Sequence, residues 1–194
     1  MNDACSPDLD FPGHDKLVQA IDAAVANGDQ HAITAALRNT LCMLIRDRDV
    51  RLPDCVHEPI SDHYARRELY RSPAHGYSVV AMTWGPGQGT PLHDHAGIWC
   101  VEGVVEGRMD VTQFDLVEED RDAFRFEQKG CVHAAVGSAG CLIPPFEYHV
   151  LANALDEPSM TIHIYGGEMK SCHVFEPVEG GRYVRRDRAL CYHD

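Results

Sequence analysis

The stretch Gly87-Gln-Gly-Thr-Pro-Leu-His93-Asp-His95-Ala-Gly-Ile-Trp-Cys100, continuing as Val-Glu-Gly-Val-Val-Glu-Gly107, decides how this chain folds. Side chains alternate along an extended segment with a period of two, so His93 and His95 point to the same side and can bind one ion. The glycines and prolines just before them break regular structure, which favours a turn that leads into a strand. Imidazole binds iron, zinc, copper and nickel, but two ligands seldom hold a metal, so a third donor must come from elsewhere in the chain.

Length and charge limit the class of protein. With 194 residues the chain is long enough for one domain with a substantial core and too short for two comfortable ones. The net charge of -13 argues against nucleic acid or an anionic membrane as a partner, because either requires a basic face, and it favours a small ligand. No apolar run approaches the ~20 residues of a membrane-spanning helix, and the first residues lack the pattern of a signal peptide. We therefore expect a cytoplasmic protein, and we expect it to be a monomer.

The cysteines do not form a recognisable disulfide framework. There are eight of them, they are scattered along the chain, and none belongs to a Cys-x-x-Cys pair. A chain of this size is stable without disulfides, so we predict free thiols, most of them small buried residues.

Hydrophobic periodicity predicts two helices followed by many short strands. Apolar residues recur at helical spacing over 15–26 and 31–46. From Tyr77 onward, β-branched or aromatic runs alternate with glycine or acidic turns, and they predict strands at 77–84, 98–105, 107–115, 123–128, 131–136, 140–143, 148–153, 159–165 and 172–176. This pattern indicates a mainly β fold, an antiparallel sandwich or closed barrel. We expect residues 1–60 to form a helical segment packed on a barrel of residues 61–194, as one structural domain overall.

Two charged segments are predicted to lie on the surface. The first is Tyr64-Ala-Arg66-Arg67-Glu-Leu-Tyr70-Arg71-Ser, in which charges are dense. The second comprises the last twenty residues, which carry several arginines in an acidic protein. We expect this tail to be a solvated edge strand or a clamp over acidic loops.

The best candidate for the third donor is His149. It lies in Leu142-Ile-Pro144-Pro-Phe-Glu-Tyr-His149-Val-Leu-Ala-Asn153, which again reads as a turn followed by an apolar strand. The next predicted strand, Thr161-Ile-His163-Ile-Tyr165, alternates polar and apolar residues, so its three polar groups share one face. A polar inner face is costly in a small barrel unless these groups bind one another, a metal or a ligand.

These motifs together resemble the cupin family. Gly87, the His93-x-His95 pair and Gly107 are similar to the first cupin motif, and Pro144, His149 and Asn153 are similar to the second. Two departures stand out. Many cupins carry a glutamate ligand after the histidine pair, where this chain has Trp99 and Cys100, and Phe146 stands where glycine is usual. The resemblance implies a small antiparallel β-barrel or jelly roll with the N-terminal helices packed outside.

Among cupins, three histidines with a cysteine after the pair most closely resemble the thiol dioxygenases, and above all the cysteine dioxygenase family. The stretches that agree, in one order from about residue 60 to 176, are Tyr64-Ala-Arg66, Trp84-Gly85, His93-Asp-His95, Thr161-Ile-His163-Ile-Tyr165 and Cys172-His-Val-Phe175. The resemblance implies one iron(II) ion per chain and a reaction that adds both atoms of O2 to the sulfur of L-cysteine, giving cysteine sulfinic acid. Three neutral imidazoles leave coordination positions open for a thiolate, an amine and dioxygen.

The resemblance also implies roles for individual residues. His93, His95 and His149 would bind the iron. Arg66 would receive the substrate carboxylate by a two-pronged hydrogen bond, although its neighbour Arg67 remains an alternative, because counting back from His93 can select either.

The remaining implied roles concern the predicted strand at 159–165. Tyr165 would place its hydroxyl near the thiolate and oxygen, with His163 as its partner. Thr161 would supply a hydroxyl to His163, and Cys100 lies at the distance past His95 at which the family forms a thioether with this tyrosine. Trp84 and Trp99 are expected to be wall or core residues on their size.

Two other functions compete with this interpretation. The nearest is a dioxygenase for another small thiol, above all 3-mercaptopropionate. Such relatives carry glutamine in place of the arginine before the barrel and place a different arginine after the tyrosine strand, whereas this chain has Arg66 and, later, Lys170-Ser171-Cys172-His173. The other is a noncatalytic metal- or ligand-binding cupin, or a cupin isomerase, with a metal other than iron. Convergence of Arg66, Cys100 and Tyr165 on one pocket would favour the enzyme.

Overall fold

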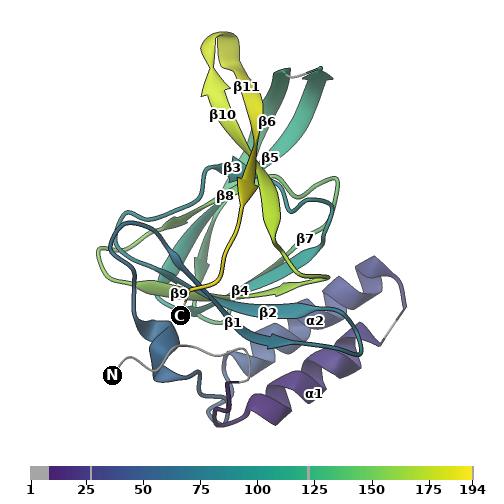
Figure 1. Ribbon diagram of the computed structural model, residues 1–194, viewed down its shortest axis with the longest axis vertical. Helices are drawn as coiled ribbons and strands as arrows, with labels where there is room; N and C mark the ends of the chain where they lie inside the picture. The colour runs from purple at the N-terminus through teal and green to yellow at the C-terminus, as the bar shows by residue number, and fades with distance from the viewer. Residues whose placement is uncertain (1–8, 27, 122, 194) are drawn as a thin grey trace.

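The computed structural model describes residues 9–26, 28–121 and 123–193, and its strands form two antiparallel sheets (Figure 1). One sheet has the order β1-β2-β9-β4-β7, and the other closes on itself in the order β10-β11-β6-β5-β8-β3. The strands are β1 (Ala65–Arg71), β2 (Ser78–Trp84), β3 (Leu92–His93), β4 (Cys100–Glu106), β5 (Arg108–Asp120), β6 (Ala123–Ala135), β7 (Ala139–Leu142), β8 (His149–Asn153), β9 (Ser159–Tyr165), β10 (Ser171–Val178) and β11 (Arg182–Ala189). The predicted mainly β cupin fold, a small antiparallel barrel, is confirmed.

Two N-terminal helices, α1 (His14–Val25) and α2 (Gln30–Leu44), cover the outer face of the five-stranded sheet (Figure 1). The Asp29 side chain accepts the backbone N–H of Ala32 and so caps the start of α2. The buried helical stripe packs on apolar residues that alternate along the strands; these residues are Leu17, Ile21, Leu37 and Leu41 from the helices and Val79, Ala81, Val101, Ile162 and Ile164 from the sheet. The predicted position of the helices outside the barrel is therefore confirmed.

A glycine in β4 lets α2 approach the sheet closely. A Cβ atom at Gly103 would lie 2.7 Å from Ile45 Cδ1 and 3.0 Å from Leu41 Cδ2. The contact between α2 and β4 thus fixes which face of β4 is covered by a helix. The opposite face of β4 points into the barrel.

The prediction that 64–72 forms a surface segment is wrong. Residues Ala65–Arg71 form β1, which pairs along its length with β2, and its first five residues are buried. Arg66 and Arg67 are 3% and 5% exposed. Charge density misled the prediction because a buried arginine needs only acceptors for its guanidinium, which carbonyl groups supply here.

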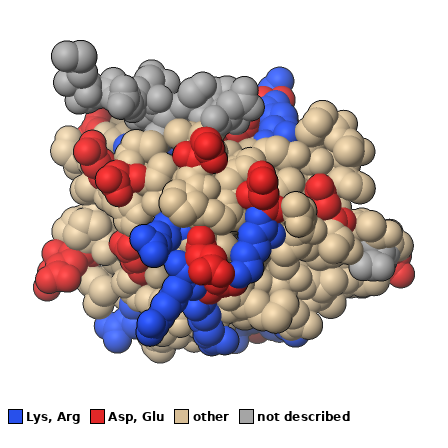
Figure 2. Space-filling view, turned by 90° about the horizontal axis from the view of Figure 1, so that it is seen from below, with Lys and Arg blue, Asp and Glu red and all other residues tan. Residues whose placement is uncertain are grey.

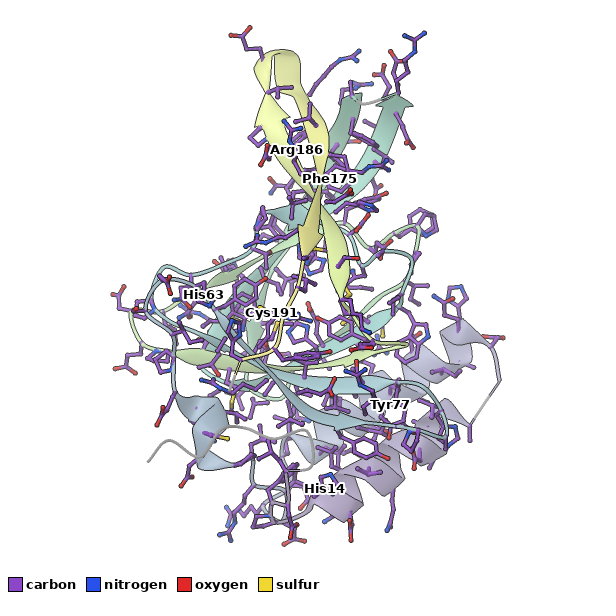
Figure 3. All side chains as sticks on the ribbon, viewed as in Figure 1. His14, His63, Tyr77, Phe175, Arg186 and Cys191 are labelled. Atoms are coloured by element: carbon purple, nitrogen blue, oxygen red, sulfur yellow. The ribbon has the colours of Figure 1, made fainter. Side chains whose placement is uncertain are left out.

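Two hairpins project from the barrel on the side away from the helices (Figure 1). The predicted strands at 123–128 and 131–136 are one continuous strand, β6, with a register shift where Gln128 and Gly130 face β5. The C-terminal tail contributes β11, which pairs with β10 and β6. An aromatic cluster around Phe175, labelled in Figure 3, joins the hairpins to the barrel.

The prediction of free thiols holds for most of the described cysteines but is wrong at Cys55, and the prediction that most of them are buried is wrong, because only Cys100 and Cys172 are buried. Free thiols are found at Cys42, Cys100, Cys131, Cys141, Cys172 and Cys191. Cys55 is disulfide-bonded.

The surface on the side of the helices carries both signs of charge. Figure 2 shows Lys and Arg side chains lying among Asp and Glu on this face. Within the part of the chain that the structure describes, no helix is both long and apolar enough to cross a membrane.

Truncating Leu41, which is fully buried, should destabilise the protein. Leu41→Ala removes packing between α2 and the sheet and leaves a cavity, so we expect the free energy of unfolding to fall by about 2–5 kcal/mol. Met43 lies on the same helix with 66% of its surface exposed, and Met43→Ala should change stability by less than about 0.5 kcal/mol. Urea unfolding followed by circular dichroism measures both. Equal effects of the two substitutions would contradict the described packing of α2.

Candidate metal centre

Three histidines meet inside the barrel. His93 in β3 lies directly opposite His149 in β8, and His95 follows two residues after His93. The ring centroids of His93 and His149 are 4.4 Å apart, and those of His95 and His149 are 5.0 Å apart. One ligand nitrogen from each ring lies within 4.8 Å of the others. The structure therefore brings together the three side chains that the sequence predicted as ligands.

The residue between the first two histidines points away from them. Asp94 accepts the backbone N–H of His173 at 2.8 Å and lies 2.6 Å from its Nδ1 atom. These contacts tie the turn after β3 to β10. Alternation along the extended chain thus sends Asp94 to the neighbouring strand while His93 and His95 face the interior.

Backbone carbonyl groups fix the orientation of two imidazoles. His93 Nδ1 lies 3.0 Å from the Pro91 carbonyl oxygen, and His149 Nδ1 lies 2.9 Å from that of Glu147. A carbonyl only accepts, so each Nδ1 carries the proton and each Nε2 keeps its lone pair. His149 Nε2 is buried and has no hydrogen-bond partner among the described residues, as fits a nitrogen that binds a metal.

Glu147 supports the third imidazole. Its Oε2 accepts the backbone N–H of His95 at 3.1 Å and lies 3.3 Å from His95 Nδ1, without a hydrogen bond of good geometry to that nitrogen. Burial raises the pKa of Glu147 to about 7, with Asp94 adding to the effect. Burial also holds the pKa of His95 and of His149 well below the usual range, and the neighbouring histidines lower it further. The imidazoles are therefore neutral, as metal binding requires.

The donor set fits the iron that the sequence led us to expect. Three neutral imidazoles form a site that suits iron, zinc, copper or nickel, and their orientation leaves the Nε2 atoms of His93 and His149 free of protons. His93, His95 and His149 would hold the ion.

A hydrogen-bonded chain lies beside the three histidines. Trp84 Nε1 donates to Thr161 Oγ1 at 2.9 Å, and Thr161 Oγ1 lies 2.8 Å from His163 Nε2. Because the indole only donates, the threonine proton is directed to His163 Nε2, and His163 carries its own proton on Nδ1. His163 Nδ1 is 3.4 Å from the Tyr165 hydroxyl oxygen. The predicted pairing of His163 with Tyr165 and Thr161 is thus present, and Trp84 also takes part in it.

Cys100 lies on the same inner face. It pairs directly with Tyr165 across β4 and β9, and its sulfur is 3.8 Å from His163 Nδ1. Cys100 is fully buried, and burial raises the pKa of its thiol well above the usual value. The two predicted thioether partners are therefore neighbours across the sheet.

Sequence reasoning missed Glu102, a buried carboxyl group beside this cluster. Its Oε2 lies 3.3 Å from His163 Nδ1 and 3.9 Å from His149 Nε2. Burial raises its pKa to about 8. Period-two alternation from Cys100 places Glu102 on the inner face of β4, and this is the signal by which the sequence could have identified it.

Arg66 and Arg67 point to opposite sides of β1. Arg66 lines the cavity that contains the three histidines and Tyr165. Its guanidinium makes two long contacts, 3.3 Å to the Cys191 carbonyl and 3.4 Å to the Met169 carbonyl. Arg67 instead donates to the Glu58 carbonyl at 2.9 Å. Of the two candidates, Arg66 is the one that faces the site.

The C-terminal segment closes one side of the cavity. Leu190 lines the cavity, and its backbone N–H donates to the Lys170 carbonyl at 2.8 Å. The backbone N–H of His193 donates to the Arg66 carbonyl at 2.7 Å. Cys191, labelled in Figure 3, marks where this segment crosses the barrel. The expected clamp therefore lies over the Arg66 side of the site rather than over acidic loops.

The chain resembles known proteins over the region that forms this site. The family model described as cysteine dioxygenase type I matches residues 61–177, more than half of the chain. The cysteine dioxygenase type 1 proteins of Rattus norvegicus and Homo sapiens are each 22% identical over 113 residues, a match that covers 54% of this chain and 52% of each relative. The chain thus spans about half the length of the curated relatives it matches.

Solved structures show weaker similarity. A double-stranded beta-helix protein from Klebsiella pneumoniae is 17% identical with a TM-score of 0.48, and the match covers 63% of this chain and 94% of that one. An oxalate oxidase is 15% identical with a TM-score of 0.44, over 58% of this chain and 55% of that one.

Removing one imidazole should abolish metal binding without unfolding the protein. We expect His149→Ala to lose ferrous iron after reconstitution, because two ligands seldom hold a metal, while its circular dichroism spectrum stays unchanged. His31, which is exposed on α2 and belongs to no cluster of possible metal ligands among the described residues, supplies the matched control His31→Ala. Metal analysis by mass spectrometry measures both. Stoichiometric iron in His149→Ala would remove this residue from the site.

Glu147→Gln should weaken metal binding while the three ligands remain. The amide keeps an oxygen for the His95 backbone N–H but loses the charge next to Nδ1, and loss of such an outer contact typically lowers metal affinity about 10–100-fold. Competition with a chelator measures the affinity. Unchanged affinity would show that Glu147 does not support the metal site.

Proposed function

Since the chain belongs to the cysteine dioxygenase type I family, we propose that it is a non-haem iron(II) thiol dioxygenase that converts L-cysteine to cysteine sulfinic acid. Both atoms of O2 enter the product, so RSH and O2 give RSO2H and no external reductant is needed. The observation that carries the proposal is one buried cavity lined by three imidazoles, Arg66 and Tyr165. We also propose that the enzyme acts in the cytoplasm as a monomer.

Iron held by His93, His95 and His149 would supply the site at which thiolate and dioxygen react. The protein contributes burial and orientation. The three imidazoles are buried or nearly so, at 9%, 1% and 0% exposed, so the bound thiol is shielded from water. Neutral imidazoles add no negative charge, which favours an anionic substrate.

Arg66 would bind the carboxylate of cysteine. A guanidinium offers parallel N–H donors that match a carboxylate, and the present contacts of Arg66 to two carbonyl groups at 3.3 and 3.4 Å are long. The carboxylate would replace these weak contacts with charge-assisted ones. The thiol would then be held toward the histidines.

Tyr165 would donate a hydrogen bond to the reacting oxygen or sulfur. His163 holds the ring by its Nδ1 atom, and Trp84 and Thr161 keep His163 in the tautomer that carries a proton there. Burial raises the pKa of Tyr165 well above its usual value, so the hydroxyl keeps its proton and remains a donor. Cys100 and Tyr165 lie opposite each other, and we propose that O2 can oxidise the pair to a thioether, taking the thiol hydrogen and one ring hydrogen to give H2O2.

Oxygen uptake by the iron-loaded protein with three thiols tests the proposal. We expect cysteine to be consumed faster than 3-mercaptopropionate or cysteamine, with cysteine sulfinic acid as the product identified by mass spectrometry. Faster O2 uptake with 3-mercaptopropionate than with cysteine would identify 3-mercaptopropionate as the substrate. Preference for cysteamine would overturn the role of Arg66, because that thiol has no carboxylate. No uptake with any thiol would favour a noncatalytic metal-binding cupin.

Arg66→Ala should selectively impair the oxidation of cysteine. A hydrogen bond to a charged group contributes about 1.5–3 kcal/mol, so kcat/KM for cysteine should fall roughly 10–100-fold, whereas the rate with cysteamine should change little. Arg67→Ala is the matched control, because Arg67 contacts the Glu58 carbonyl outside the cavity. Equal losses with both thiols would contradict carboxylate binding by Arg66.

A further inference from the structure

A second cavity lies inside the barrel, on the other side of the buried polar cluster. It has a volume of about 120 Å³ and is lined mainly by aliphatic side chains of β4, β5, β6 and β7. Val104 and Met109 form part of its wall, and the 53% exposed Val132 lies at its outer end. A dry apolar cavity of about 150 Å³ in another protein binds benzene or xenon, so a cavity of this size can hold a small apolar guest.

The absence of a side chain at Gly140 keeps this cavity open. Gly140 in β7 pairs directly with Glu102 in β4. Directly paired residues of antiparallel strands place their side chains on the same face, so a side chain at Gly140 would point into the barrel above Glu102. A Cβ atom built at Gly140 has no neighbour within 4 Å.

The inner end of the cavity borders the metal site. Leu151 lines both cavities, and Glu102 and Thr161, which line only the second, contact His163 in the wall of the first. Glu102 Oε2 is 3.9 Å from His149 Nε2, the nitrogen left free for a metal. A small molecule at the inner end of the cavity therefore lies one side chain away from the ligand nitrogens.

The two cavities differ in chemistry. The first contains Arg66, Tyr165 and the imidazoles and suits a charged thiol. The wall of the second is mainly aliphatic, with Glu102, Gln113, Ser138 and Thr161 as its polar members, and it has no cationic group to bind an anion. Apolar guests gain by leaving water for such a wall.

We infer that the second cavity binds dioxygen and delivers it to the metal site past Leu151, while the thiol enters on the side of Arg66. This inference rests on the proposed function for the identity of the guest. The cavity would raise the local concentration of O2 beside the ligand nitrogens and keep its route separate from that of the thiol. O2 and the thiol would then not compete for one entrance.

Xenon, an apolar probe of similar size, tests the cavity independently of activity. Crystals of the protein under xenon pressure should show xenon between Gly140 and Leu151. Gly140→Val should abolish this density by filling the cavity, and Ala134→Leu should do so from the opposite wall. Gly130→Val is the matched control, because Gly130 lies in β6 outside the cavity wall and a Cβ atom there also meets nothing within 4 Å.

The dependence of the rate on O2 concentration then tests whether the second cavity delivers O2 to the metal site. In both filled variants kcat/KM for O2 should fall by about tenfold, with KM for cysteine and iron content unchanged, whereas Gly130→Val should match the parent protein. Absence of xenon from the parent cavity would overturn the inference, and so would oxygen dependence within about twofold of the parent in both filled variants. If the protein oxidises no thiol, the proposed function and the delivery route both fail, while xenon occupancy still establishes the cavity as an apolar gas site.

Discussion

Burying three uncharged imidazoles with their lone pairs turned inward is the constraint on which this structure depends. A buried polar group costs free energy unless it is hydrogen-bonded, and each histidine has a second nitrogen that must be satisfied. His93 and His149 meet this need locally, because each Nδ1 reaches a carbonyl two residues earlier in its own chain. His95 has no such carbonyl contact and instead lies beside the carboxyl group of Glu147. The pairing of β3 with β8 then sets the distance between rings, since His93 and His149 are direct neighbours.

Period-two alternation lets the same strands serve the core and the site. In β9, Ile162 and Ile164 belong to the apolar cluster under the helices, while the intervening His163 faces the barrel interior. Burying one aliphatic side chain contributes about 1.5–3 kcal/mol, comparable to the cost of burying one polar group. The helices therefore do more than cover an end of the sheet, because their packing on its outer face offsets the cost of the polar inner face.

Local spacing explains which parts of the site could be predicted. The His93-x-His95 pair, His149 after its turn and the alternating Thr161, His163 and Tyr165 are patterns of a few residues, and the structure brings all six side chains to one region. Features that depend on pairing between distant strands could not be predicted. The strand β1 looked like surface because its charges are satisfied by remote carbonyl groups, and the choice between Arg66 and Arg67 required knowing which side of β1 faces the cavity.

The Glu102 side chain contacts the buried histidines and also lies between the two cavities. Its carboxyl group lies between His163 and His149, and its strand neighbour across β7 is a glycine, so the space on its far side stays open. An apolar residue at this position would leave His163 Nδ1 with only the Tyr165 hydroxyl at 3.4 Å and the Cys100 sulfur at 3.8 Å. Glu102 Oε2 lies closer, at 3.3 Å, but makes no hydrogen bond to a described residue, so the Tyr165 hydroxyl remains the hydrogen-bonding neighbour of this nitrogen. The Glu102 carboxyl group puts a polar boundary between the charged cavity and the aliphatic one, so the two halves of the barrel interior can differ in chemistry although they are only a few ångströms apart.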